Sequence, residues 1–102
     1  MVIRRATTPT HPFECDVDLS IMAEIIITYS QRGIVVLEKR KKDCRIEGNT
    51  IFVKLTQEET LEFNPSYKVD IELTFKTLGG DVLKNEDPII VTVKKSKNED
   101  IL

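Results

Sequence analysis

The chain of 102 residues has no tryptophan, a single histidine and only two cysteines. Cys15 and Cys44 lie far apart, with no second Cys or His at ligand spacing, so neither can form a zinc knuckle or a CxxC redox pair. We expect two reduced, partly buried thiols, because free cysteine is usually buried. A mutual disulfide is the alternative. No metal and no other cofactor is predicted.

Long apolar runs and an excess of one charge are also missing. No stretch reaches the roughly eighteen apolar residues of a membrane-crossing helix, and no apolar run of signal-peptide length follows Arg4 and Arg5. The formal net charge of -2 provides no positive field for a nucleic-acid backbone. We therefore expect a protein that stays in the cytoplasm where it is made and binds neither membrane nor nucleic acid.

The composition that remains is typical of a folded domain. Hydrophobic residues make up 40 % and charged residues 31 % of the chain, which is too apolar for a disordered segment of modest net charge. The length suits one core. We expect a single domain over residues 1–102, with residues 1–8 and 96–102 as the candidates for fraying.

Apolar and polar residues alternate along Val69–Lys76, which is typical of a half-buried strand. Gly79 and Gly80 follow and predict a tight hairpin turn, with Pro88–Lys94 as an irregular return strand. A second hairpin is predicted around Gly33, and a third around the Gly-Asn turn at 48–49.

One short helix is predicted between strands. Thr56 can cap the N–H of Glu59 while Glu59 reaches back to the backbone of Thr56, and a proline at position 65 ends the helix. We expect Leu61 and Phe63 to point inward. Evenly spaced strands with short turns indicate a sandwich or a barrel. We favour an all-β fold, an immunoglobulin-like antiparallel β-sandwich of about seven strands.

Candidate catalytic residues are few. His11 is the only obvious general base, and it lies between Thr10 and Pro12 in an extended segment where we expect an exposed or edge histidine. The carboxylates of Glu58, Glu59 and Glu62 are explained by the helix cap and a solvated helix face. We predict that the protein is not an enzyme.

Two segments are the candidates for partner binding. The first runs from Thr8 to Phe13 and is expected at an edge or in a loop, because proline cannot donate to a sheet; Phe13 is its expected anchor. The second is a basic run, interpreted as the solvated end of a strand or, alternatively, an anion patch. The candidate binding residues are Thr8, His11, Phe13, Lys39, Arg40, Lys41 and Lys42.

Several segments resemble a family of small uncharacterised proteins of Gram-positive bacteria and their prophages. One of them is 53–63, and its most specific part is Leu55–Thr60, with the sequence Leu-Thr-Gln-Glu-Glu-Thr. The others are 3–13, 25–31, 47–51 and 89–93. The order of elements also resembles the N-terminal β-sandwich module of phage baseplate upper proteins.

This resemblance implies a virion or prophage structural protein of the tail or baseplate region. Such a protein works through protein–protein contacts, with itself as a homo-oligomer and with other phage structural proteins, and it is found in the cytoplasm when synthesised and in the virion after assembly. The resemblance supplies no catalytic residues. The alternative is a bacterial cytoplasmic adaptor or binding domain of the β-sandwich type.

Overall fold

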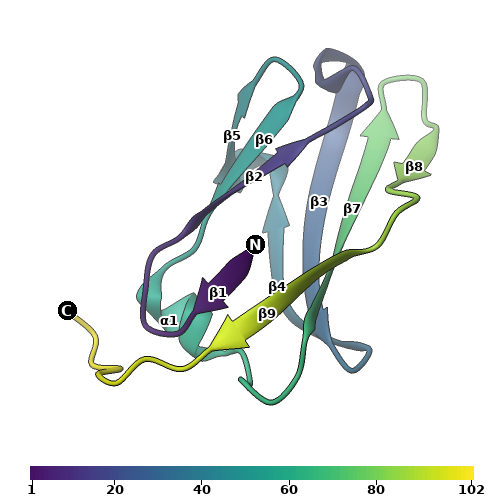
Figure 1. Ribbon diagram of the computed structural model, residues 1–102. Coiled ribbons are helices and arrows are strands. Elements are labelled where there is room, and N and C mark those ends of the chain that lie inside the picture. Colours follow the sequence, from purple (N-terminus) through teal and green to yellow (C-terminus); the bar gives the residue numbers. More distant parts are fainter.

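The computed structural model describes residues 1–102 and contains nine β-strands and one α-helix (Figure 1). The strands are β1 (Val2–Arg4), β2 (Thr10–Glu14), β3 (Met22–Gln31), β4 (Ile34–Arg40), β5 (Cys44–Glu47), β6 (Thr50–Lys54), β7 (Val69–Thr77), β8 (Val82–Lys84) and β9 (Ile89–Lys94). The helix α1 is Gln57–Leu61, and two short 3₁₀ turns are Leu19–Ile21 and Lys41–Asp43. The predicted all-β fold with one short helix is confirmed, with nine strands rather than about seven.

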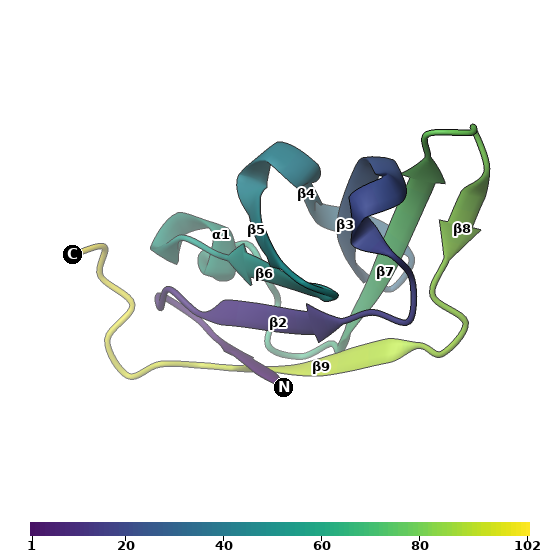
Figure 2. The same cartoon turned by 90° about the horizontal axis from the view of Figure 1, so that it is seen from above.

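The strands form two sheets that face each other. The larger sheet has the order β1-β9-β7-β3-β4, with β8 also paired to β7, and the smaller has the order β2-β6-β5. The larger sheet curls around the smaller one, as the view from above shows (Figure 2). Eighteen buried apolar residues form one core cluster, in which Tyr29 and Phe63 are among the largest side chains without exposed surface. The predicted sandwich architecture is confirmed.

Two of the three predicted hairpins are present as expected. β3 and β4 are joined by Arg32 and Gly33, whose φ angles are 53° and 76°. β5 and β6 turn at Gly48, with φ 57°. Glycine takes such positive angles without steric cost, which explains why a glycine is found at both turns.

The third hairpin differs from the prediction. The strand that returns immediately after Gly79 and Gly80 is β8, which pairs with the second half of β7. β9 pairs instead with the first half of β7, where Val69 is opposite Val91. Between them the side chain of Asn85 takes the place of a strand: its Oδ1 accepts a hydrogen bond from the N–H of Leu73 at 2.8 Å. The irregular segment 85–88 is therefore the connection between two short strands.

The N-terminus also departs from expectation. Val2–Arg4 forms β1, which pairs in parallel with β9, so the sheet is mixed and not wholly antiparallel. Ile3 has no exposed surface. Frayed residues were expected here because a segment of three residues is too short to show periodicity. The parallel pairing joins segments about ninety residues apart, beyond the reach of a local pattern.

The capping box of α1 is present as predicted. Thr56 Oγ1 accepts from the N–H of Glu59 at 3.1 Å, and Glu59 Oε1 accepts from the N–H of Thr56 at 2.8 Å. Phe63 is fully buried, but Leu61 is only half-buried and Thr60 is the helix residue that faces inward. The hydroxyl of Thr60 is accommodated because it donates to backbone carbonyls and accepts from the N–H of Thr7 at 3.2 Å.

Candidate functional site

The basic run 39–42 is bound largely within this chain. Lys39 Nζ lies 2.7 Å from a carboxylate oxygen of Glu59. Arg40 is paired with Glu38 at the same distance, and Lys41 Nζ donates to the carbonyl of Met22 at 2.9 Å. Three of the four cations are therefore bound to oxygen atoms of this chain. Lys42 is exposed on the 3₁₀ turn that follows β4.

The pairing of Lys39 with Glu59 links β4 to α1. Burial works against the charged form of Glu59, but hydrogen bonds from Lys39 and from the N–H of Thr56 outweigh it and lower the pKa of this carboxyl. The ion pair is only partly exposed, so water and salt screen it less than a surface pair. This contact is structural.

Two of the other candidate binding residues, His11 and Phe13, lie in the core, and only the burial of His11 departs from expectation. β2 is an edge strand as predicted, but its side chains alternate, so that His11 and Phe13 point inward and Pro12 outward. His11 is 2 % exposed and Phe13 4 %. The expected role of Phe13 as an anchor is confirmed. Thr8 is exposed in the connection between β1 and β2.

His11 is hydrogen bonded to Tyr29 across the two sheets. Its Nδ1 lies 2.8 Å from the hydroxyl of Tyr29, and its Nε2 is buried with no hydrogen-bond partner. Burial, and then the positive N-terminus, lowers the pKa of His11, whereas burial raises the pKa of Tyr29. Both side chains are therefore neutral at neutral pH. Phe63 packs against the ring of Tyr29, with 5.9 Å between centroids, so this pair is part of the core.

The cysteines are both free: Cys15 is buried and Cys44 is half-buried. The expectation of partly buried thiols is confirmed. Burial, with the charge of Asp16, raises the pKa of Cys15. Burial, with the charge of Asp43, likewise raises the pKa of Cys44. Both sulfur atoms are held as thiols at neutral pH, which makes them poor nucleophiles.

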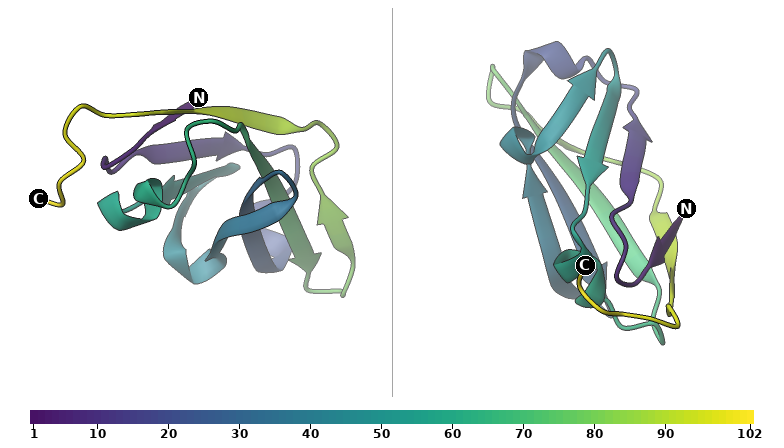
Figure 3. Two further views of the ribbon diagram at one scale, coloured as in Figure 1. Left: turned by 90° about the horizontal axis from the view of Figure 1, so that it is seen from below. Right: turned by 90° about the vertical axis from the view of Figure 1, so that its left-hand side faces the viewer.

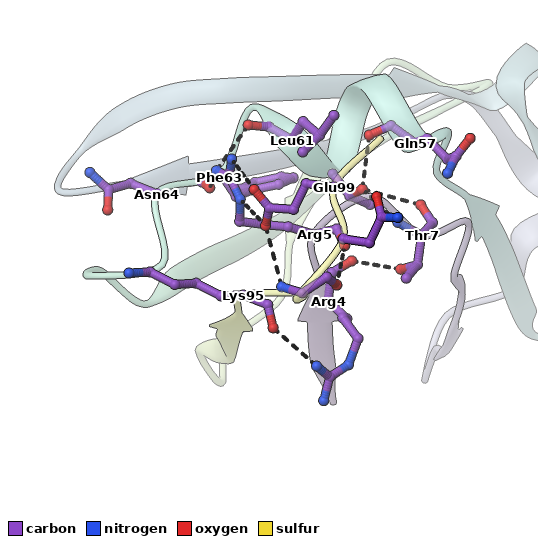
Figure 4. Close-up of polar contacts among 12 residues, drawn as sticks. Arg4, Arg5, Thr7, Gln57, Leu61, Phe63, Asn64, Lys95 and Glu99 are labelled. Atoms are coloured by element: carbon purple, nitrogen blue, oxygen red, sulfur yellow. Dashed lines mark hydrogen bonds and ion pairs between the residues drawn. The ribbon is translucent and has the colours of Figure 1, made fainter. Parts of the chain in front are cut away.

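Arg5 is the centre of a network that the sequence did not predict (Figure 4). Its Nε and Nη2 donate to the carboxylate of Glu99 at 3.0 and 3.1 Å. Its Nη1 donates to the carbonyls of Leu61 at 3.1 Å and Phe63 at 2.7 Å. One guanidinium thus joins the end of β1, the end of α1 and the C-terminal segment, and hydrogen bonds to Glu99 lower the pKa of that carboxyl.

The hollow beside Arg5 is an unpromising binding site. It has a volume of about 360 Å³, and Phe63 is the single hydrophobic residue among the seven that line it. Four N–H groups of the guanidinium are already used within the chain, so little of its donor capacity is left for a ligand. The network instead holds the C-terminal segment against the body of the molecule, where fraying was expected. The N–H of Leu102 donates to the side chain of Gln57 at 2.9 Å, which extends the same attachment.

A larger groove is lined by residues at and just after the end of β2 and by residues of β7, β8 and the connection from β8 to β9. Its volume is about 510 Å³, within the range of ligand sites. Half of the twelve residues that line it are apolar. These apolar residues are Cys15, Val17, Leu73, Phe75, Leu83 and Ile89.

The charged residues of this groove are mainly acidic. Glu14 and Asp16 come from the end of β2, and Glu86 and Asp87 come from the connection between β8 and β9. All four are exposed, and none belongs to any of the five ion pairs in the structure. The single cation, Lys84, is bound to Glu72 at 2.8 Å. We name this feature the acidic groove.

A second feature is the outer edge of β4. This strand is the last in its sheet and pairs only with β3. It begins with four apolar residues, of which Ile34 is 70 % exposed and Val35 58 %. In the right-hand view of Figure 3, β4 and β1 lie on opposite sides of the molecule. The sheet therefore ends on this side in an open, apolar edge.

The acidic groove could not be found from sequence, because its walls come from segments about seventy residues apart. The one local signal was the acidic segment 85–88, which indicated only an irregular strand.

The structure has no group of His, Cys, Asp and Glu side chains that could hold a metal ion. None of its helices has the length and apolar character needed to span a membrane. No protein-family model, curated protein or solved structure matches the chain.

Proposed function

We propose that this chain is a non-catalytic structural or assembly module of a phage or prophage, of the tail or baseplate region, and that it works through contacts with its own copies and with other phage proteins. The open edge of β4 is the observation that supports an assembly role. The resemblance of Leu55–Thr60 and the accompanying segments to prophage proteins supports the phage setting.

An open edge strand exposes a row of backbone N–H and C=O groups that another strand can pair with. Proteins that stay monomeric usually protect such edges with charges, proline or short strands. β4 has charges only in its second half, at Glu38, Lys39 and Arg40, and Glu38 and Arg40 are paired with each other. The first half, Ile34–Leu37, is apolar. It is the least protected edge segment of the fold.

A second copy of the chain is the occupant that this edge fits best. Two β4 strands that pair antiparallel about a twofold axis use the same residues on both sides, so the contact closes after two copies. Pairing satisfies the open backbone groups and removes Ile34 and Val35 from water. The charged second half of β4 limits the contact to the apolar half.

Sedimentation velocity tests this contact. We expect the wild-type chain to sediment as a species larger than a monomer and the Val35→Lys variant to sediment as a monomer, because a buried lysine without a partner disfavours the contact. Val82→Lys is the matched control: Val82 is 59 % exposed on β8, away from the edge. A wild-type chain that stays monomeric at all concentrations would contradict the contact and favour the cytoplasmic adaptor.

A further inference from the structure

The acidic groove takes no part in the proposed contact between copies, and its chemistry is different. We propose that it binds a segment of a partner polypeptide in which an apolar side chain is flanked by lysine or arginine. This inference goes beyond the proposed function, because it assigns a second surface and the chemistry of a second partner.

The six apolar residues that line the groove form what we call its floor. This floor exists because two short strands share one edge of β7. β8 and β9 pair with opposite halves of that strand, and residues 85–88 connect them without strand structure. Asn85 satisfies the backbone of Leu73 in place of a strand, with hydrogen bonds in both directions at 2.8 and 3.3 Å. Solvent therefore reaches Leu83, which is 40 % exposed, and the half-buried Val17 and Ile89, while Cys15, Leu73 and Phe75 are buried beneath them. An apolar side chain that enters it loses contact with water.

The rim gives the groove its charge preference. The lining contains four carboxylates, which we call the rim, and one cation, Lys84. Lys84 is already paired with Glu72, which lies outside the groove. Like charges beside an apolar floor set up a negative potential, which attracts cations and repels acidic segments. Lysine and arginine side chains on either side of an apolar anchor match this arrangement.

A polypeptide fits this site better than a small ion. The rim carboxylates come from two walls and do not gather as a metal site does. A polypeptide segment can place an apolar side chain on the floor and cations at both walls at the same time, which a small ion cannot.

A displayed library of random peptides, selected on the wild-type chain, tests the proposal. We expect the enriched peptides to share an apolar residue flanked by Lys or Arg. A synthetic peptide of that consensus should shift the amide resonances of Cys15, Leu73 and Leu83 in a two-dimensional NMR spectrum. No enriched consensus, an acidic consensus, or shifts that map outside the groove would overturn the proposal.

Charge reversal supplies the matched comparison. Glu86→Lys with Asp87→Lys should weaken binding of the consensus peptide by about tenfold or more. Glu24→Lys with Glu58→Lys changes the net charge equally at exposed positions outside the groove and should leave binding within about twofold. Equal binding by both double variants would overturn the assignment. Should the groove double variant fail to fold, the milder Glu86→Gln replaces it, with a smaller loss expected.

The proposal for the edge of β4 and the proposal for the acidic groove can be tested independently. Val35→Lys, at the edge of β4, should bind the consensus peptide as the wild type does. The groove variant should sediment as the wild type does. A result in which both variants lose both properties would show that the groove and the edge are not separate surfaces, and would overturn the second assignment.

Discussion

His11 is the core residue that has a buried polar atom without a hydrogen-bond partner. Its ring carries one satisfied nitrogen, hydrogen bonded to Tyr29 at 2.8 Å, and one buried nitrogen without a partner. If Tyr29 donates to Nδ1, the N–H at Nε2 is left unpaired; an unpaired buried polar group costs about 1–3 kcal/mol. The rings of His11 and Tyr29 also pack against each other, with 5.8 Å between their centroids. Protonation of His11 would add a buried charge to this site.

Stability should therefore fall in mild acid. Burial lowers the pKa of His11 in the folded chain, so the unfolded chain takes up a proton near pH 6.5 while the folded chain does not. The free energy of unfolding should be level above about pH 6.5 and fall below it by at most about 1.4 kcal/mol per pH unit. Urea unfolding at a series of pH values between about 7.5 and 5 measures this slope. Histidine ordinarily titrates within that range, whereas carboxyl groups ordinarily titrate below it.

His11→Phe is the control for that prediction. His11 is the only histidine of the chain, so its replacement should remove the slope in this pH range whatever it does to stability at neutral pH. The carboxyls whose pKa is lowered, Asp18, Glu59 and Glu99, should affect stability only in stronger acid. A slope that persists in the variant would show that another group is responsible.

Phe13 should contribute strongly to stability. Its side chain is almost fully buried between the sheets, so Phe13→Ala should lower the free energy of unfolding by about 3 kcal/mol. Phe52→Ala is the matched control, because Phe52 is half-buried on the neighbouring strand and stacks on Arg45 at 4.2 Å. It should cost clearly less. Chemical unfolding compares the two, and equal losses would contradict the assignment of Phe13 as an anchor.

At this scale the sequence predicted Phe13 and the cap residues Thr56 and Glu59, and it predicted an edge position for His11 but not its burial. The reason is that Pro12 was interpreted as a break in regular structure. In the structure Pro12 lies on an edge strand, where a missing N–H is tolerated, and the alternation of buried and exposed side chains continues through it. Arg5 was missed because its partners lie more than fifty residues away.

Among the elements, α1 depends on its cap. The helix has only five residues, and so few turns are not stable without side-chain and tertiary contacts. Thr56→Ala should lower the free energy of unfolding by about 1 kcal/mol, because the N–H of Glu59 loses its acceptor. Thr56→Ser keeps the hydroxyl and should cost much less. If chemical unfolding gives the same stability for both variants, the cap does not stabilise the fold.

The elements predicted from sequence are those with local signals. The alternation of β7 and the glycine turns before β4 and β6 identified these strands, and the Thr56 and Glu59 pair identified α1. β1 and β8 were missed, because each has only three residues and is defined by its pairing. β9 was found and pairs antiparallel with β7 as a return strand should, but the intervening β8 was not predicted, since a sequence pattern marks a strand and not its partner.

For the molecule as a whole, the arrangement of the two sheets creates features that no single segment carries. The acidic groove needs β2 to lie across from the connection of β8 to β9, and the open edge needs β4 to end its sheet. Of the seven candidate binding residues, neither the Thr8 to Phe13 segment nor the basic run contributes to the groove. The predicted type of function, protein–protein contact, remains a proposal with different residues behind it.

Mass spectrometry of purified phage particles, released after the prophages of the host are induced, tests the proposed role most directly. The abundance of this chain is compared with that of the tail proteins in the same particles. We expect the chain to be present at a fixed multiple of the tail proteins, as a virion component assembled with defined symmetry must be. Its absence from intact particles, while it is abundant in the cells that produced them, would contradict the proposed structural role.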